Sequence, residues 1–251
     1  MTDLRVSVVM PAYNESEQIV PALERLTDAI TLDHEILVVV DSPEDLTIQA
    51  MDAESHRFPS ARILVQDYGR GPANAIRFGI DAADANCVVV TMADGCDDVQ
   101  LIDDLVRLVE RGCAVAAASR YMAGGAQIGG PRIKKWMSRS AGLSLHLLAG
   151  VGTRDATNSF KAYDTDFVRD VGLQSRAGFE IAIELVAKAH RLRRPIAEIP
   201  TIWLDRSSGE SNFHIRKWLP DYLRWYRFAY GPQLTLAQLR SRTSVSPKAE
   251  T

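Results

Sequence analysis

Short apolar runs alternate with longer amphipathic stretches through the first half of the chain. The apolar runs are typical of strands buried on both faces of a sheet, and the stretches between them are typical of helices. The predicted strands cover residues 4–10, 35–40, 62–66 and 87–91. Asn14 or Ser16 is a candidate cap for the first helix. Strands and helices that alternate at this spacing predict βαβ units, and therefore an α/β fold with a mainly parallel central sheet.

The alternation continues in the second half of the chain. Further helices are predicted at 98–111, 131–149 and 179–190. Further strands are predicted at 114–118, at the end of the segment 155–163, and at 196–204. The segment after Arg240 is polar, and we expect it to be disordered.

Three of the predicted strands end in acidic turns, which carry Glu15, Asp41 and Asp94. Parallel strands present their carboxyl ends on one edge of a sheet, where open α/β sheets bind ligands, so these carboxylates should converge there. Carboxylate oxygens suit Mg²⁺ or Mn²⁺, and such an ion can hold the phosphates of a nucleotide. Asp97 and Asp98 follow closely. A second interpretation, given equal weight, is that the acids after residue 93 cap the next helix.

Composition narrows the class of protein. The 251 residues carry a formal net charge of -3, which provides no general attraction for nucleic acid. The three cysteines include no Cys-x-x-Cys pair, which fits a reducing compartment and argues against a zinc site or a disulfide framework. We see neither a signal-peptide pattern nor an apolar run near the ~18 residues of a membrane span. We therefore expect a cytoplasmic protein that binds no nucleic acid, with any membrane contact peripheral and on the inner face.

Basic and hydroxyl side chains lie after two of the later predicted strands and near the start of one predicted helix. Arg120 and Arg206 come after predicted strands, and Lys134, Ser138 and Arg139 lie near the start of the helix at 131–149. Arginine forks and helix N-termini bind phosphate well. The alternative is that these residues form a solvated basic face of the helix, and this is our default interpretation for Lys135 and Arg139.

Motifs in both halves of the chain match, in order, those of one known family. In the first half these are residues 9–15 (Val-Met-Pro-Ala-Tyr-Asn-Glu), 41–47, 69–79 and 92–94. In the second half they are residues 119–121 (Ser-Arg-Tyr), 155–161, 178–180 and 206–211. The chain resembles the inverting family 2 glycosyltransferases with the GT-A fold, and its second half resembles their dolichyl-phosphate mannose synthase branch.

This resemblance implies one Rossmann-like GT-A domain over residues 1–230. It implies a nucleotide-sugar half at 1–98, an acceptor half at 99–230, and a C-terminal helix or tail at 231–251 that is partly disordered. The implied activity is transfer of a sugar from a nucleotide-diphosphate donor to a polyprenyl phosphate, with inversion. The branch favours mannose from GDP-mannose, with glucose next.

The resemblance also implies site residues. The nucleotide-sugar contacts are Pro11, Tyr13, Glu15, Asp41, Asp45, Gly71, Asp94 and Arg206. The acceptor-phosphate contacts are Arg120, Lys134 and Ser138. The catalytic candidates are Asp94, which would hold Mg²⁺ or Mn²⁺, Arg206, and Asp97 and Asp98. Asp97 or Asp98 would supply a second metal ligand, or the base if the acceptor were a hydroxyl.

Two residues depart from the family pattern. Met92 replaces the first carboxylate of the metal motif, and a thioether is a poor ligand for Mg²⁺. Asn212 replaces a lysine, which removes a positive charge near the diphosphate. Two alternatives therefore stay open. One is a family 2 transferase that acts on a glycan or a small-molecule hydroxyl, and the other is a non-catalytic nucleotide-binding relative.

Aromatic and basic residues are interspersed over 216–228. This pattern suits a membrane interface, where aromatic rings and basic side chains both find partners. It suits equally a C-terminal helix that packs on the core, so the sequence leaves both interpretations open.

Overall fold

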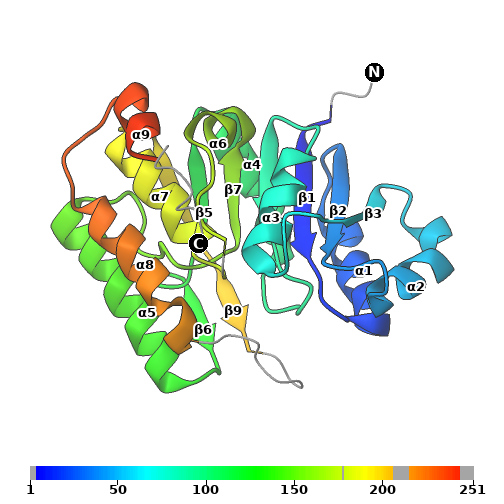
Figure 1. Ribbon diagram of the computed structural model, residues 1–251. Coiled ribbons are helices and arrows are strands. Elements are labelled where there is room, and N and C mark those ends of the chain that lie inside the picture. The colour runs from blue at the N-terminus through cyan, green and yellow to red at the C-terminus, as the bar shows by residue number, and fades with distance from the viewer. Residues whose placement is uncertain (1–3, 177, 206–214, 244–251) are drawn as a thin grey trace.

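A seven-stranded sheet forms the centre of the molecule, and a computed structural model describes it together with residues 4–176, 178–205 and 215–243 of the chain (Figure 1). The strand order is β3-β2-β1-β4-β7-β5-β8. The strands are β1 (Val6–Pro11), β2 (His34–Val40), β3 (Ala61–Val65), β4 (Cys87–Val90), β5 (Val115–Ser119), β7 (Lys161–Asp164) and β8 (Ile196–Pro200). Among the described strands of this sheet, β7 alone runs antiparallel to its neighbours, β4 and β5. The predicted α/β fold with a mainly parallel sheet is confirmed.

Both faces of this sheet are buried, which explains the unbroken apolar runs in the sequence. Val8 and Val9 are neighbours in β1, yet they belong to apolar clusters on opposite faces. The Val8 cluster takes in α1 (Ile19–Ala29), α2 (Leu46–Ala53) and α4 (Ile102–Glu110). The Val9 cluster takes in α3 (Pro72–Asp81), α6 (Thr165–Val171), α7 (Ile181–Arg191), α8 (Ile215–Ala229) and α9 (Leu236–Thr243). Helices therefore form a layer on each side of the strands.

Several predicted elements are divided or displaced in the structure. The helix expected at 98–111 begins as a 3₁₀ turn, η3 (Val99–Leu101), before α4. The helix expected at 131–149 is α5 (Arg132–Ser144) followed by a π-helical segment, η4 (Leu145–Ala149). The strand expected at 196–204 is split, because β9 (Ile202–Leu204) leaves the main sheet and pairs with β6 (Ala126–Ile128). The sequence analysis missed β6, α6 and the 3₁₀ turn η2 (Ser55–Arg57).

Neither Asn14 nor Ser16 caps the first helix. Both have positive φ angles, 51° and 48°, and η1 (Ser16–Gln18) intervenes before α1, whose N-cap residue Gln18 makes no side-chain capping bond. At the other end of the chain α9 extends beyond Arg240, so the expected disorder is wrong for residues 241–243. Residues 244–251 lie outside the described residues.

Among the described helices, none combines the length and apolar character that a membrane crossing requires.

Candidate functional site

Three predicted acidic residues lie beyond one edge of the sheet. The strands β2, β1 and β4 are adjacent and parallel, so their carboxyl ends face the same way. Glu15, Asp41 and Asp94 follow these ends, and each is partly exposed. The three residues therefore lie beyond one edge of the sheet, where the sequence placed them.

Arg120, one of the predicted acceptor residues, lies beyond the same edge. Because β7 is antiparallel to both β4 and β5, those two strands run in the same direction. Arg120 directly follows β5 and thus emerges on the same side as Asp94. The predicted donor and acceptor groups therefore share one rim, which runs from β2 to β5. Arg206 lies outside the described residues.

Asp41 ties the end of β2 to the turn before α3. One carboxylate oxygen accepts a hydrogen bond from Gln66 Nε2 at 2.7 Å, and the other accepts one from the Gly71 N–H at 3.0 Å. Gly71 has a φ of 123°, a conformation that favours glycine. It is the N-cap residue of α3, so Asp41 fixes the position of a helix start.

Asp45 performs a similar task for the turn after β1. It is buried, caps α2 through the Thr47 N–H at 2.9 Å, and accepts bonds from the Asn14 N–H at 3.0 and 3.1 Å. The Glu15 N–H donates to the Thr47 hydroxyl at 3.1 Å. This turn begins at Pro11 and leaves Tyr13 largely exposed at the rim. Asp45 thus positions the turn that carries three of the predicted nucleotide contacts, Pro11, Tyr13 and Glu15.

The acids after β4 do not cap the next helix. Asp98 is the N-cap residue of η3 but makes no side-chain capping bond, and the Asp94 carboxylate accepts the Cys96 N–H at 3.0 Å. Asp97 is buried, with one oxygen accepting from the Thr91 hydroxyl at 3.0 Å and the Met92 N–H at 3.3 Å. The capping interpretation is therefore wrong for Asp97 and Asp98.

Burial changes the acidity of Asp97. Loss of solvent, and then the negative charge of Asp94, raise the pKa of Asp97 to about 7, against the hydrogen bonds from Thr91 and Met92. The positive charge of Arg120 also opposes this rise. Asp97 is therefore a buried carboxyl whose charge depends on its neighbours at the rim.

The donor set after β4 fits a divalent ion only if substrate supplies most of the ligands. No group of three or more His, Cys, Asp or Glu side chains in the described parts of the chain is arranged to hold a metal. Asp94 offers a partly exposed carboxylate at the rim. Mg²⁺ commonly binds one or two carboxylates and completes its shell with phosphate and water. A site of that kind fits the residues present.

Arg120 is held in place by a buried partner. Asp155, which is fully buried, accepts bonds from Arg120 Nε at 2.7 Å, Nη2 at 2.9 Å and the backbone N–H at 3.0 Å. Burial opposes the charge on both groups, but their pairing outweighs it, raising the pKa of Arg120 and lowering that of Asp155. The guanidinium is therefore charged and has one orientation.

Ser138 joins this network from α5. Its hydroxyl lies 3.2 Å from Arg120 Nη2, 3.0 Å from the Tyr121 hydroxyl and 2.6 Å from the Thr157 hydroxyl. The structure thus brings Arg120 and Ser138 together, as the sequence predicted. Lys134 lies one turn earlier on α5 and is partly buried.

Four contributors to this network received no role from the sequence: Tyr121, Asp155, Thr157 and Lys161. Lys161 is fully buried in β7, and its ammonium donates to the Asn158 carbonyl. Burial lowers the pKa of Lys161 to about 7, although the charges of Asp155 and Asp97 work against this. The available signal was the order of charged residues in 155–161, but sequence spacing does not tell which cation pairs with which carboxylate.

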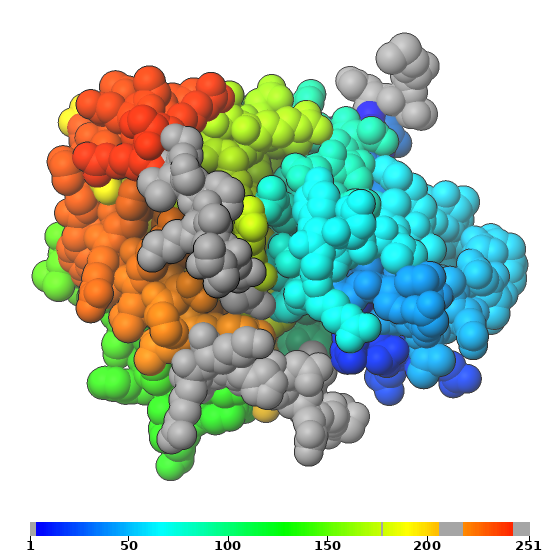
Figure 2. Space-filling model, in the orientation of Figure 1, coloured from blue at the N-terminus to red at the C-terminus, as the bar shows by residue number. Residues whose placement is uncertain are grey.

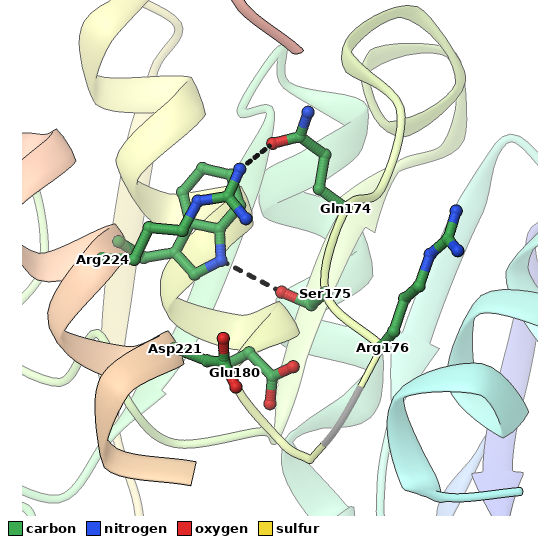
Figure 3. A pocket seen from close by; sticks show the side chains of 7 residues that line it. Gln174, Ser175, Arg176, Glu180, Asp221 and Arg224 are labelled. Atoms are coloured by element: carbon green, nitrogen blue, oxygen red, sulfur yellow. Dashed lines mark hydrogen bonds between the residues drawn. The ribbon is translucent and has the colours of Figure 1, made fainter. Parts of the chain in front are cut away.

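A small polar pocket of about 110 Å³ lies between α8 and the segment that precedes α7 (Figure 3). In it Arg224 donates to the Gln174 amide oxygen at 2.9 Å, and the Trp225 indole donates to the Ser175 hydroxyl at 3.1 Å. The remaining lining residues are Arg176, Glu180 and Asp221. Among the predicted site residues that the structure describes, none lines this pocket.

Solved structures identify the class of fold. The chain is similar to glucosyl-3-phosphoglycerate synthase from Mycobacterium tuberculosis bound to Mn²⁺, uridine diphosphate and glucosyl-3-phosphoglycerate, with a TM-score of 0.61 and 18% identity. That match covers 97% of this chain and 81% of the other. It is also similar to residues 1–349 of TarS from S. aureus bound to UDP-GlcNAc, with a TM-score of 0.64 and 16% identity over 93% and 69% of the two chains. The fold is that of the GT-A glycosyltransferases.

The sequence identifies the family within this class. Residues 7–172 match the family described as glycosyl transferase family 2, and the chain belongs to that family. An undecaprenyl-phosphate mannosyltransferase from Micrococcus luteus is 28% identical over 214 residues, which cover 83% of this chain and 87% of the relative. A dolichol-phosphate mannosyltransferase from Pyrococcus furiosus is 28% identical over 226 residues, or 88% of this chain. The chain spans 62% of the length of this second relative.

Proposed function

We propose that this enzyme transfers a sugar from a nucleotide-diphosphate donor to a polyprenyl phosphate, with inversion at the anomeric carbon. Two mannosyltransferases that are named for polyprenyl-phosphate acceptors and match most of this chain support the proposal. They favour mannose, from GDP-mannose, over glucose. The observation that carries the proposal is the oriented guanidinium of Arg120 beside Ser138, on the same rim as Asp94.

The donor half of the proposed site comprises residues 1–98. Glu15 and Asp41 bind the nucleoside, because carboxylates at this rim can accept bonds from ribose hydroxyls or a base edge. Pro11, Tyr13 and Asp45 form or position the first turn, and Gly71 brings backbone close to the nucleotide. Asp94 would hold a divalent ion, which would supply positive charge to the departing diphosphate. Arg206 contributes positive charge to the same group.

The acceptor half comprises residues 99–230. Arg120, Lys134 and Ser138 bind the acceptor phosphate and place one oxygen opposite the leaving group. That oxygen forms a bond to the anomeric carbon as the bond from this carbon to the diphosphate breaks, and the electron pair leaves with the nucleoside diphosphate. A phosphate monoester is already largely ionised at neutral pH, since its second pKa is ~6, so the reaction needs no protein base. The enzyme meets its lipid substrate as a peripheral protein on the cytoplasmic face.

A donor and acceptor screen tests the proposal. Wild-type enzyme is supplied with labelled GDP-mannose or UDP-glucose, and with a short-chain polyprenyl phosphate or the matching polyprenol that lacks phosphate. We expect label on the phosphate acceptor only, with GDP-mannose the better donor. Chelation of divalent ions should abolish the transfer, and added Mg²⁺ or Mn²⁺ should restore it.

Other outcomes of this screen separate the alternatives. Label on the polyprenol or on an added glycan would favour a hydroxyl acceptor, for which Asp97 or Asp98 would be the base. Binding of a nucleoside diphosphate, measured by calorimetry, without transfer or donor hydrolysis would favour a non-catalytic relative.

A further inference from the structure

A buried glutamine lies beneath the turn that joins β3 to α3. Gln66 directly follows β3 and is 5% exposed, whereas the next four residues, 67–70, are exposed. Its backbone N–H donates to the Val40 carbonyl at 3.0 Å, which extends the pairing of β3 with β2. The sequence patterns pointed to no role for Gln66. In the structure its side-chain amide is shielded from the solvent that surrounds the turn.

The amide of Gln66 bonds to three groups. Nε2 donates to an Asp41 carboxylate oxygen and to the Gly69 carbonyl oxygen, both at 2.7 Å. Oε1 accepts from the Tyr68 N–H, also at 2.7 Å. A carboxylate and a carbonyl oxygen can only accept, so these partners fix which end of the amide carries the N–H groups. Gln66 therefore holds its partners in one arrangement.

These contacts reach the proposed donor site. Asp41 follows β2, and its second oxygen accepts from the Gly71 N–H at the start of α3. Gly69 and Gly71 have φ angles of 99° and 123°, which favour glycine. Gln66 holds the carbonyl of the first glycine, and Asp41 holds the N–H of the second. In Figure 2 the cyan atoms of this part of the chain lie against the blue atoms of the N-terminal segments.

The neutral charge of the amide suits this position. A carboxylate has about four acceptor sites, and Gln66 and Gly71 occupy one on each oxygen of Asp41. The remaining sites can accept from a ligand. A lysine or arginine in place of Gln66 would compensate the charge of Asp41, and a glutamate would repel it. A glutamine orients Asp41 and leaves its negative charge available to hydroxyl and N–H groups of a ligand.

We propose that Gln66 is a positioning residue of the donor site. It orients the Asp41 carboxylate and the turn 66–71 toward the nucleoside of the donor, and it touches none of the reacting atoms. Its contribution therefore falls on the affinity for the nucleotide and not on the rate of the chemical step. The identity of the ligand as a nucleotide rests on the proposed function.

Calorimetric binding of GDP at saturating Mg²⁺ tests this role in wild type and in Gln66→Glu. Two carboxylates this close cannot both ionise easily, so at low pH they share a proton and stay hydrogen-bonded. At about pH 8 most of this proton is lost, and the two side chains repel each other. We expect Gln66→Glu to bind GDP at least about tenfold more weakly than wild type at the higher pH, and almost as tightly at about pH 5.5.

Two further variants separate this effect from general damage. Gln49→Glu makes the same change at an exposed position of α2 and should bind GDP like wild type at both pH values. Gln66→Met keeps the size of the side chain without its amide, so it should bind GDP at least about tenfold more weakly at both pH values. If circular dichroism shows that Gln66→Glu is unfolded at the higher pH, Gln66→Met alone decides.

Initial rates then separate affinity from chemistry. With the sugar donor varied, Gln66→Met should raise KM at least about tenfold and change kcat by less than about twofold. Equal binding of GDP by wild type and Gln66→Met would overturn the role of Gln66. A loss of kcat at unchanged KM would also overturn it, and so would a defect of Gln66→Glu that is the same at both pH values.

The same measurements distinguish this inference from the proposed function. UDP replaces GDP in every comparison if wild type binds it more tightly. Wild type that binds the nucleotide but transfers no sugar to a polyprenyl phosphate would overturn the proposed function alone, because the variants still compare nucleotide binding. Wild type that binds neither nucleotide would overturn both.

Discussion

Asp155 determines the orientation of the Arg120 guanidinium, which we propose binds the acceptor phosphate. Asp155 is fully buried and the Arg120 side chain is only 11% exposed, so water cannot solvate either charge in place of its partner. Asp155→Asn keeps the shape of the side chain but leaves a buried cation without its partner. Breaking one member of a buried pair costs about 3–5 kcal/mol. We expect the free energy of unfolding, measured in urea, to fall by about that amount.

The matched control for this change is Asp104→Asn. Asp104 pairs with Arg107 at 2.8 Å on the solvent side of α4, where both side chains are largely exposed. An exposed pair contributes about 0–1 kcal/mol, so this variant should unfold almost like wild type. Equal losses in the two variants would contradict the role assigned to Asp155.

The raised pKa of Asp97 should make the free energy of unfolding depend on pH. Burial raises its pKa from 3.8 to about 7, so the folded protein keeps a proton that the unfolded chain releases. The free energy of unfolding contributed by Asp97 is therefore present below pH 4 and is lost as the pH rises to about 7. Asp97→Asn cannot ionise.

Urea unfolding at several pH values measures this effect. The stability of Asp97→Asn relative to wild type should increase from pH 4 to pH 7 and then level off. A difference between the two proteins that stays constant over this range would contradict a buried, protonated Asp97.

At the scale of single elements, two helix starts allow a comparison of stability with function. Asp45 caps α2, and Asp164 caps α6 through the N–H groups of Asp166 and Phe167. Replacing either by Ala should destabilise the protein by about 1 kcal/mol, as measured by urea unfolding. Only Asp45 also holds the Asn14 N–H in the turn after β1.

We therefore expect Asp45→Ala to raise the KM for the nucleotide sugar, and Asp164→Ala to leave it unchanged. Initial rates at varied donor concentration give both values. A KM that rises equally in the two variants would show that general loosening, and not the first turn, controls donor binding.

Elements with a clear local pattern of apolar residues could be predicted from the sequence, whereas their pairing with distant strands could not. Cys87–Val90 is an apolar run between turns, and its place in the sheet was predictable because burial on both faces leaves no polar position. The direction of β7 was not, because four residues that include the buried Lys161 carry no information on how they pair. The exchange of partners at Thr201, between β8 and β9, depends on the distant strand β6.

At the scale of the whole molecule, parallel strand direction made part of the site predictable. Glu15, Asp41 and Asp94 could be placed on one rim because each follows a strand that the sequence identifies. The pairing of Arg120 with Asp155 could not, since the two residues are 35 positions apart and belong to different elements. The exposure of Trp136 on α5 could not be predicted either, since it depends on which side of this helix the core covers.

The central claim is that the rim of this sheet binds the diphosphate of the sugar donor near Asp94 and the acceptor phosphate at Arg120, so that the sugar passes from the first to the second. Its most direct test is the initial rate of labelled sugar transfer from GDP-mannose to a short-chain polyprenyl phosphate at saturating Mn²⁺, for wild type, Asp94→Ala and the surface control Asp104→Ala. We predict that wild type and Asp104→Ala make the lipid-linked sugar at similar rates, and that Asp94→Ala is at least about 100-fold slower. An Asp94→Ala enzyme as fast as wild type would contradict the account.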